Sequence, residues 1–442
     1  MSPRAARRDL GRRLLGPLSR LTTRGRAVLA AGLTCALCAV VLGQQDLLRV
    51  GVLLALVPVI TVLVLGRARY RLACARSISP VRVEVGKPAQ VVLEIANVSS
   101  TRCGMVLAEE QVPYTLGSRP RFVLPGLESG ERRAVSYPVR SDVRGRFLVG
   151  PLSLTLTDPF GMGEHRRSFT ARDQLIVIPK VAALPPVQLP GDWSGSGDSR
   201  PRAVSASGED DVTTREYRQG DDLRRVHWRS TARRGELMVR REEQPWQSRA
   251  TLLLDRRRAA HRGDGPESSF EWAVSAIASV AVHLASRGYA VRLVDGTEGQ
   301  ESANPWAHIA SSGGESTSSA VLDTLSSVAP GGGIELQRAV HAAARAATGG
   351  LVVAALGEID EQDTAMLASL HQAGTNCVAL VADTASVIND AALFTQVRER
   401  TLAQVEQLRA AGWDVVPARG REPLEQTWRR IGSGRSLGGV RR

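Results

Sequence analysis

The stretch AVLAAGLTCALCAVVLGQQDLLRVGVLLALVPVITVLVLG, residues 27–66, decides the architecture of the N-terminal part of the chain. It holds two runs of seventeen residues without a charged side chain, 27–43 and 50–66, separated by six residues. An α-helix rises about 1.5 Å per residue, so each run spans roughly 25 Å, at the short end of the lengths that cross a bilayer. Membrane helices tolerate a proline such as Pro58. We therefore predict two transmembrane helices, at residues 27–45 and 47–66.

Two other interpretations of the apolar runs are a cleaved signal peptide and a buried helical hairpin. A signal peptide has one short apolar core followed by a cleavage site, whereas here a second apolar run follows the first closely. The pattern therefore favours a two-span hairpin, which contacts membrane lipid through residues 27–66.

The formal charge of +13 is concentrated beside these runs. Residues 1–76 contain thirteen arginines and two acids, whereas residues 77–442 contain 44 basic and 42 acidic groups. Eight arginines precede Ala27 and four follow Gly66, so the positive-inside rule predicts a two-pass protein of the cell membrane with both termini in the cytoplasm. A nucleic-acid surface needs basic groups clustered on a folded face, and the nearly neutral remainder argues against one.

Residues 77–180 alternate between apolar and polar side chains, as in VRVEV at 81–85. Prolines interrupt the segment repeatedly, which confines those positions to edges and turns. About seven short strands without a helical period predict an antiparallel β-sandwich of immunoglobulin-like type.

Residues 181–208 are rich in Gly, Ser and Pro and predict a flexible linker, after which residues 209–246 form a densely polar segment. From 247 to 430 apolar strands such as TLLLD (251–255) alternate with helical patterns such as SFEWAVSAIASVAVHLASRG (269–288). Gly288, Gly374 and Gly412 each stand where a helix is expected to end before a strand. This order predicts an α/β domain with a parallel sheet, followed by a tail at 431–442.

Common catalytic patterns are missing from the sequence. It has no GxxxxGK[ST], no HExxH and no zinc-type cysteine spacing outside the first apolar run. We therefore predict no catalytic residue and no cofactor.

The polar segment TREYRQGDDLRRVHWRSTARRGELMVRREEQP, residues 214–245, is the densest group of functional side chains. Asp221 is expected to cap a helix that ends at Gly235, with a strand after it. The segment is either a recognition surface, with arginines for carboxylate or phosphate and Trp228 for stacking, or an internal ion-pair network. His227 fits a hydrogen-bonded structural role better than proton chemistry.

This segment resembles the signature of the domain of unknown function 58 family. The positions that carry the resemblance are Tyr217, Gly220, Asp221, Arg224, Trp228, Ala232 and Arg233. The resemblance implies that the α/β domain is von Willebrand factor A-like. It also implies MoxR-type AAA+ ATPases and transglutaminase-like membrane proteins as partners, and no established catalytic activity.

The metal-binding version of the von Willebrand factor A fold has D-x-S-x-S after its first strand. Here Asp255 matches the acid, but Arg257 and Ala259 stand in place of the serines. We therefore predict a degenerate site at Asp255 that binds no metal.

These observations favour a membrane-anchored cytoplasmic scaffold or adaptor. The alternative is an enzyme of unrecognised mechanism centred on Asp221, Arg224 and His227. Nucleic-acid binding through the Arg- and Trp-containing helix is the weakest of the three hypotheses.

Overall fold

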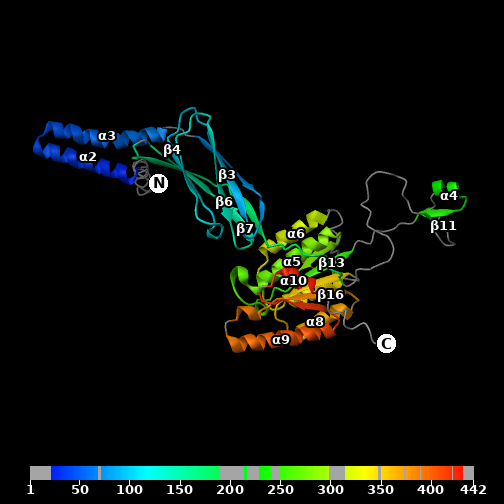
Figure 1. Cartoon of the computed structure of the whole chain (residues 1–442). Helices are drawn as coiled ribbons and strands as arrows, with labels where there is room; N and C mark the ends of the chain where they lie inside the picture. The colour runs from blue at the N-terminus through cyan, green and yellow to red at the C-terminus, as the bar shows by residue number, and fades with distance from the viewer. Residues whose placement is uncertain are drawn as a thin grey trace, which may run out of the picture. The chain divides into compact units, whose positions relative to one another are not determined.

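A computed structural model describes most of the chain, and its parts are considered separately (Figure 1). The described residues are 21–67, 71–158, 160–189, 214–216, 228–240, 248–297, 314–346, 350–372, 374–388, 390–420 and 422–431. The chain divides into two compact units. The first is residues 1–181 with 264–271 and 320–329, and the second is 182–263, 272–319 and 330–442.

The first unit begins with an antiparallel helical hairpin made of α2 (Thr23–Leu42) and α3 (Gln45–Arg67). Gly43, with a φ of 64°, ends α2 and donates its N–H to the carbonyl of Ala39. The two helices approach closely at glycines, since a Cβ added to Gly32 would lie 2.5 Å from the backbone nitrogen of Ala55. Small residues at such a contact let two apolar helices pack backbone to backbone, as membrane helices commonly do.

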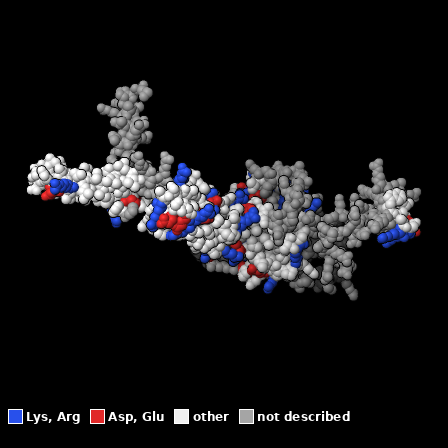
Figure 2. Space-filling model, turned by 90° about the horizontal axis from the view of Figure 1, so that it is seen from above, with Lys and Arg blue, Asp and Glu red and all other residues white. Residues whose placement is uncertain are grey.

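Both helices of the hairpin are long and apolar enough to cross a membrane, as the sequence predicts. Only 17% of each apolar window is buried, and Figure 2 shows a hairpin surface that is almost free of charged side chains except at its tip. Among the described helices one more, α5 (Ser269–Ser286), meets the same criteria, but 67% of its window is buried inside the protein. Burial identifies α5 as a core helix of the α/β domain.

The rest of the first unit is a β domain whose three sheets share one apolar core. Its strands are β1 (Leu72–Ser79), β2 (Arg82–Glu84), β3 (Pro88–Asn97), β4 (Met105–Glu110), β5 (Arg121–Leu124), β6 (Arg132–Arg140), β7 (Gly145–Val149), β8 (Leu152–Thr157), β9 (Glu164–Phe169) and β10 (Asp173–Ile178). The sheet orders are β1-β3-β6, β2-β10-β7 and β5-β4-β8-β9, and every pair is antiparallel except β2 with β10. The first strand begins at Leu72, five residues before the boundary expected at residue 77.

Arg76, at the expected end of the membrane anchor, is an internal residue of this β domain. Its Nε donates to Oε1 of Glu110 at 2.6 Å, and its Nη1 donates to Oδ2 of Asp173 at 2.6 Å. The hydroxyl of Tyr137 donates to the other oxygen of Glu110. The Arg76 side chain is only 5% exposed, and its charge is paired with Glu110. Arg76 therefore does not count among the exposed arginines that flank the spans.

The second unit contains a five-stranded sheet that is parallel throughout, in agreement with the sequence prediction. The strands are β13 (Arg249–Leu254), β14 (Ala290–Val294), β15 (Leu351–Leu356), β16 (Asn376–Val381) and β17 (Asp414–Pro417), in the order β14-β13-β15-β16-β17. Besides α5, the described helices that follow β13 in the sequence are α6 (Gly314–Ser327), most of which belongs to the first unit, α7 (Glu335–Ala346), α8 (Glu361–Gln372), α9 (Ala391–Ala410) and α10 (Leu424–Arg429). Gly288, Gly374 and Gly412 have φ of 82°, 79° and 93°, the left-handed conformation expected after a helix.

The start of the tract expected to be a flexible linker lies against the α/β domain. The backbone N–H of Ala182 donates to Oγ of Ser279 at 2.9 Å, and the carbonyl of Pro185 accepts from the buried indole of Trp428 at 3.0 Å. Leu189 is 4% exposed. These contacts differ from the expectation for 182–189, while 190–208 lie outside the described residues.

Candidate functional site

The carboxyl ends of β13 and β15 carry the densest polar cluster of the α/β domain. Asp255 directly follows β13, and Gly357 and Glu358 directly follow β15. The chain goes from β13 to β14 on one side and later to β15 on the other, so these ends form the topological switch point of the sheet. Open parallel sheets bind their ligands at such points.

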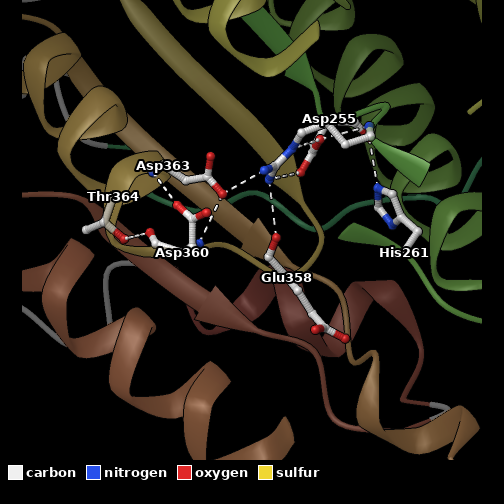
Figure 3. Close-up of polar contacts among 7 residues, drawn as sticks. Asp255, His261, Glu358, Asp360, Asp363 and Thr364 are labelled. Carbon is white, nitrogen blue, oxygen red and sulfur yellow. Dashed lines mark hydrogen bonds and ion pairs between the residues drawn. The ribbon is translucent and has the colours of Figure 1, made fainter. Parts of the chain in front are cut away.

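The guanidinium of Arg257 contacts Asp255, Asp363 and Glu358, which Figure 3 shows around one centre. Its Nε and Nη2 donate to the two carboxylate oxygens of Asp255 at 3.0 and 2.9 Å, a bidentate pair. Its Nη1 donates to Oδ2 of Asp363 at 2.7 Å, and Nη2 also donates to the carbonyl of Glu358 at 3.2 Å. One arginine therefore joins the end of β13, the end of β15 and the start of α8.

Both acids of this ion-pair cluster also accept hydrogen bonds from backbone N–H groups, in addition to those from the Arg257 side chain. The backbone N–H of Arg257 donates to Asp255 at 3.1 Å. Asp363 and Asp360 form a reciprocal cap at the start of α8, each carboxylate accepting from the other's backbone N–H, at 3.0 and 2.8 Å. A helix N-terminus is a favourable position for acidic side chains, and Asp360 and Asp363 occupy the start of α8.

Burial and charge shift two pKa values in the cluster. Burial works to lower the pKa of Arg257, but the hydrogen bonds and charges of Asp255 and Asp363 outweigh it and raise that pKa above its ordinary value. Burial lowers the pKa of His261, whose Nε2 donates to the carbonyl of Asp255 at 2.8 Å. At neutral pH the guanidinium of Arg257 is therefore charged and the imidazole of His261 is neutral.

Two further ion pairs surround this centre. Nη1 of Arg256 lies 3.4 Å from a carboxylate oxygen of Asp295, which follows β14, and donates to the hydroxyl of Thr297 at 2.8 Å. Arg262 pairs with the carboxylate of Glu358, with Nη2 at 3.2 Å from Oε2. The arginines of the loop after β13 thus neutralise the acids that follow β14 and β15.

The acids of this arrangement are occupied by ion pairs with arginine. Both carboxylate oxygens of Asp255 accept from Arg257, in the position where the D-x-S-x-S pattern would present ligands to a cation. Within the part of the chain that the structure describes, no three His, Cys, Asp or Glu residues are grouped to hold a metal ion. The sequence analysis singled out Asp255 and Arg257 but not Glu358 and Asp363. Their positions could have indicated them, because Glu358 lies just after a strand and Asp363 lies in the first turn of the next helix.

The polar signature segment is described only in part. Tyr217, Gly220, Asp221, Arg224 and His227 lie outside the described residues. The described part is an antiparallel pair, β11 (Thr214–Glu216) with β12 (Met238–Arg240), and between them the short helix α4 (Trp228–Arg234).

The signature positions of the short helix α4 are exposed. Trp228 is 71% exposed, and Ala232 and Arg233 on the same helix are exposed as well. Gly235, with a φ of 77°, follows the last helical residue, as predicted. Thr231 accepts from the backbone N–H of Met238 at 3.0 Å, which fixes the helix against β12. Trp228 is therefore not part of an internal core in this segment.

The chain was compared with curated proteins, with solved structures and with protein-family models. No curated protein matches it. Among solved structures it is similar to the CARDB domain of a protein from Pyrococcus furiosus, which was crystallised in complex with di-metal ions. The sequence identity is 13% and the TM-score is 0.20. The match covers 25% of this chain and 90% of the other. It is also similar to part of alpha-2-macroglobulin from Escherichia coli, with 16% sequence identity and a TM-score of 0.22. That match covers 26% of this chain and 17% of the other.

One family model matches residues 213–386, which include the signature segment and most of the α/β domain. Its description is "Protein of unknown function DUF58", in agreement with the resemblance of the signature segment. The chain therefore carries a DUF58 region at residues 213–386.

Proposed function

We propose that this protein is a membrane-anchored scaffold or adaptor, with its termini and both folded parts in the cytoplasm. In this proposal α2 and α3 span the cell membrane, the β domain is an immunoglobulin-like module, and the α/β domain is a von Willebrand factor A-like binding module. Its partner is a MoxR-type AAA+ ATPase, acting together with transglutaminase-like membrane proteins.

The exposed Trp228 is the observation that carries the proposal. A tryptophan that is 71% exposed on a short helix, with arginines one turn further on, has the composition of an interface hot spot. This tryptophan also lies within the region that the family model matches, in the segment that resembles the family signature. A partner that covers Trp228 accounts for both facts.

The ion-pair cluster at the sheet edge supports a binding role over a catalytic one. Asp255, Arg257 and Asp363 are joined by three side-chain hydrogen bonds. Both carboxylate oxygens of Asp255 are bonded to Arg257, so neither is free for a metal or a proton-transfer step. A von Willebrand factor A-like module with this cluster would bind its partner without a bridging cation.

Affinity purification from native membranes tests the proposal. Full-length protein is isolated as the wild type, as Trp228→Ala, and as Leu402→Ala, a matched control because Leu402 is 49% exposed on α9. We expect an AAA+ ATPase with the wild type and with Leu402→Ala, and its loss with Trp228→Ala. Recovery of no ATPase with the wild type, or equal recovery with all three proteins, would reject the adaptor role.

A further inference from the structure

The loop that joins β8 to β9 holds the β domain against the start of the first span. This loop, called the Phe160 loop, comprises Asp158 and residues 160–163 of the described chain. The carbonyl of Met162 accepts from the backbone N–H of Thr22 at 2.9 Å, and the carbonyl of Gly161 accepts from the Thr22 hydroxyl at 2.7 Å. Leu21 forms a β-bridge with Gly163 and is 3% exposed.

The contact continues into the first turn of α2. A Cβ added to Gly25 would lie 2.2 Å from the carbonyl oxygen of Met162, so only glycine allows the loop to approach this closely. The Thr22 hydroxyl also accepts from the N–H of Gly25 at 3.1 Å and so caps the helix that the loop touches. The loop and the start of α2 form one hydrogen-bonded unit.

The Phe160 loop is rigid for an internal reason as well. The carboxylate of Asp158 accepts from the backbone N–H groups of Phe160 and Gly163, at 3.0 and 2.6 Å. Gly161 has a φ of 67°, which turns the chain sharply beneath Phe160. The side chain of Phe160 is 69% exposed on this fixed turn.

The depth of the loop follows from the position of Thr22 in the sequence. The apolar run begins at Ala27, five residues after Thr22, which is about 7 Å along a helix axis. The headgroup layer on each side of the hydrocarbon core is roughly 5–8 Å thick. A loop that is hydrogen-bonded to Thr22 and packed against Gly25 therefore lies at the level of the lipid headgroups when α2 spans the membrane.

The side chains at this level suit a lipid surface. Arg24 and Arg26 are exposed in the first turn of α2, and Arg71 is exposed just beyond α3, which itself lies beside β9. Glu164 is the exposed acid next to the loop. An exposed aromatic ring among arginines, next to a membrane span, is the composition of an interfacial membrane contact.

We propose that the Phe160 loop is a second membrane contact, in which Phe160 inserts among the headgroups of a phospholipid leaflet. The β domain is thereby fixed to the membrane surface by this loop as well as by its covalent connection to the spans. This inference rests on the proposed spanning hairpin, and the experiment below separates the two.

Photocrosslinking of the full-length protein tests the inference. The protein carries p-benzoylphenylalanine in place of Phe160, Leu37 or Tyr114 and is reconstituted into phosphatidylcholine–phosphatidylglycerol vesicles. Leu37 is 67% exposed on α2 and reports on the span. Tyr114 is 92% exposed and follows the end of β4 at Glu110, whereas the other end of β4, at Met105, pairs with Thr157 next to the Phe160 loop.

After irradiation, mass spectrometry measures the protein–phospholipid adduct. We expect adducts at Leu37 and Phe160, and at Tyr114 only the amount found without irradiation. An adduct at Leu37 with none at Phe160, or equal adducts at Phe160 and Tyr114, would overturn the inference while leaving the spans in place. Absence of an adduct at Leu37 would overturn the spanning hairpin and the inference with it.

Discussion

Replacing Arg257 by methionine removes the cation from the ion-pair cluster while keeping most of the side-chain volume. Asp255, which is fully buried, then loses the bidentate pair at 3.0 and 2.9 Å, and Asp363 loses its contact at 2.7 Å. Asp363 keeps its cap at the start of α8, but Asp255 keeps only the N–H of residue 257. The substitution therefore leaves two acids close together with no cation between them.

The expected cost follows from that geometry. Removing one partner of a buried ion pair typically costs about 3–5 kcal/mol, and the 13% exposure of the Arg257 side chain places this case near 3 kcal/mol. Replacing Asp255 by asparagine at the same time removes the uncompensated charge. The double variant is expected to recover at least ~1.5 kcal/mol, a coupling typical of residues in one network.

Urea unfolding followed by tryptophan fluorescence measures these differences. All seven tryptophans lie at or beyond residue 193, so the signal comes from the C-terminal part of the chain, where Trp413 and Trp428 are buried. Arg258→Met is the control, because Arg258 is the exposed neighbour on the same loop. A loss of less than about 0.5 kcal/mol for Arg257→Met, the scale of ordinary surface substitutions, would refute the central role of Arg257.

Three further predictions concern the same edge of the sheet. The pKa of His261 is lowered in the folded protein, so the unfolded state takes up more protons below about pH 6.5, and stability falls as the pH drops from 7 to 5. The urea midpoint of His261→Gln should therefore fall less over this pH range than that of the wild type. The same fall in midpoint for both proteins would contradict this. Gly357→Ala should cost ~1–3 kcal/mol in urea unfolding, because the new Cβ would lie 2.1 Å from the carbonyl oxygen of Ala260. Gly333→Ala has no atom within 4 Å of its Cβ and should change stability little, so equal effects of the two would contradict the packing. Titration calorimetry with Mg²⁺ should give no binding heat for the wild type, and micromolar binding lost in Asp255→Ala would reverse the degenerate-site prediction.

The parts of the fold that were predictable are those with a strong local signal. The two apolar runs carry no charge over seventeen residues each, and no other pattern competes with them. The parallel strands are continuous apolar stretches, and glycines such as Gly374 mark the ends of the helices before them. Helix α6 was not predicted because Ser and Thr dominate it and weaken its apolar period. Helix α7 was missed although Leu336, Ala339, Val340 and Ala343 repeat at helical spacing and are buried.

The contacts that define the sites depend on distant residues and have no local pattern. Arg257 and Asp363 are 106 residues apart, and Arg76 pairs with Asp173 across 97 residues. The sequence around Arg76 therefore looked like a charged flank of the spans, although the residue is buried in the β domain. Likewise, nothing near Thr22 indicated that it bonds to Gly161, 139 residues away.

Direct binding of the proposed partner tests the central claim of an adaptor. The full-length protein in lipid nanodiscs is titrated with a purified MoxR-type ATPase from the same cell, using the wild type, Trp228→Ala and Leu402→Ala. The account predicts saturable binding, a Kd raised at least about tenfold by Trp228→Ala, which corresponds to ~1.4 kcal/mol, and no change with Leu402→Ala. Absence of binding by the wild type, or the same Kd for all three proteins, would contradict it.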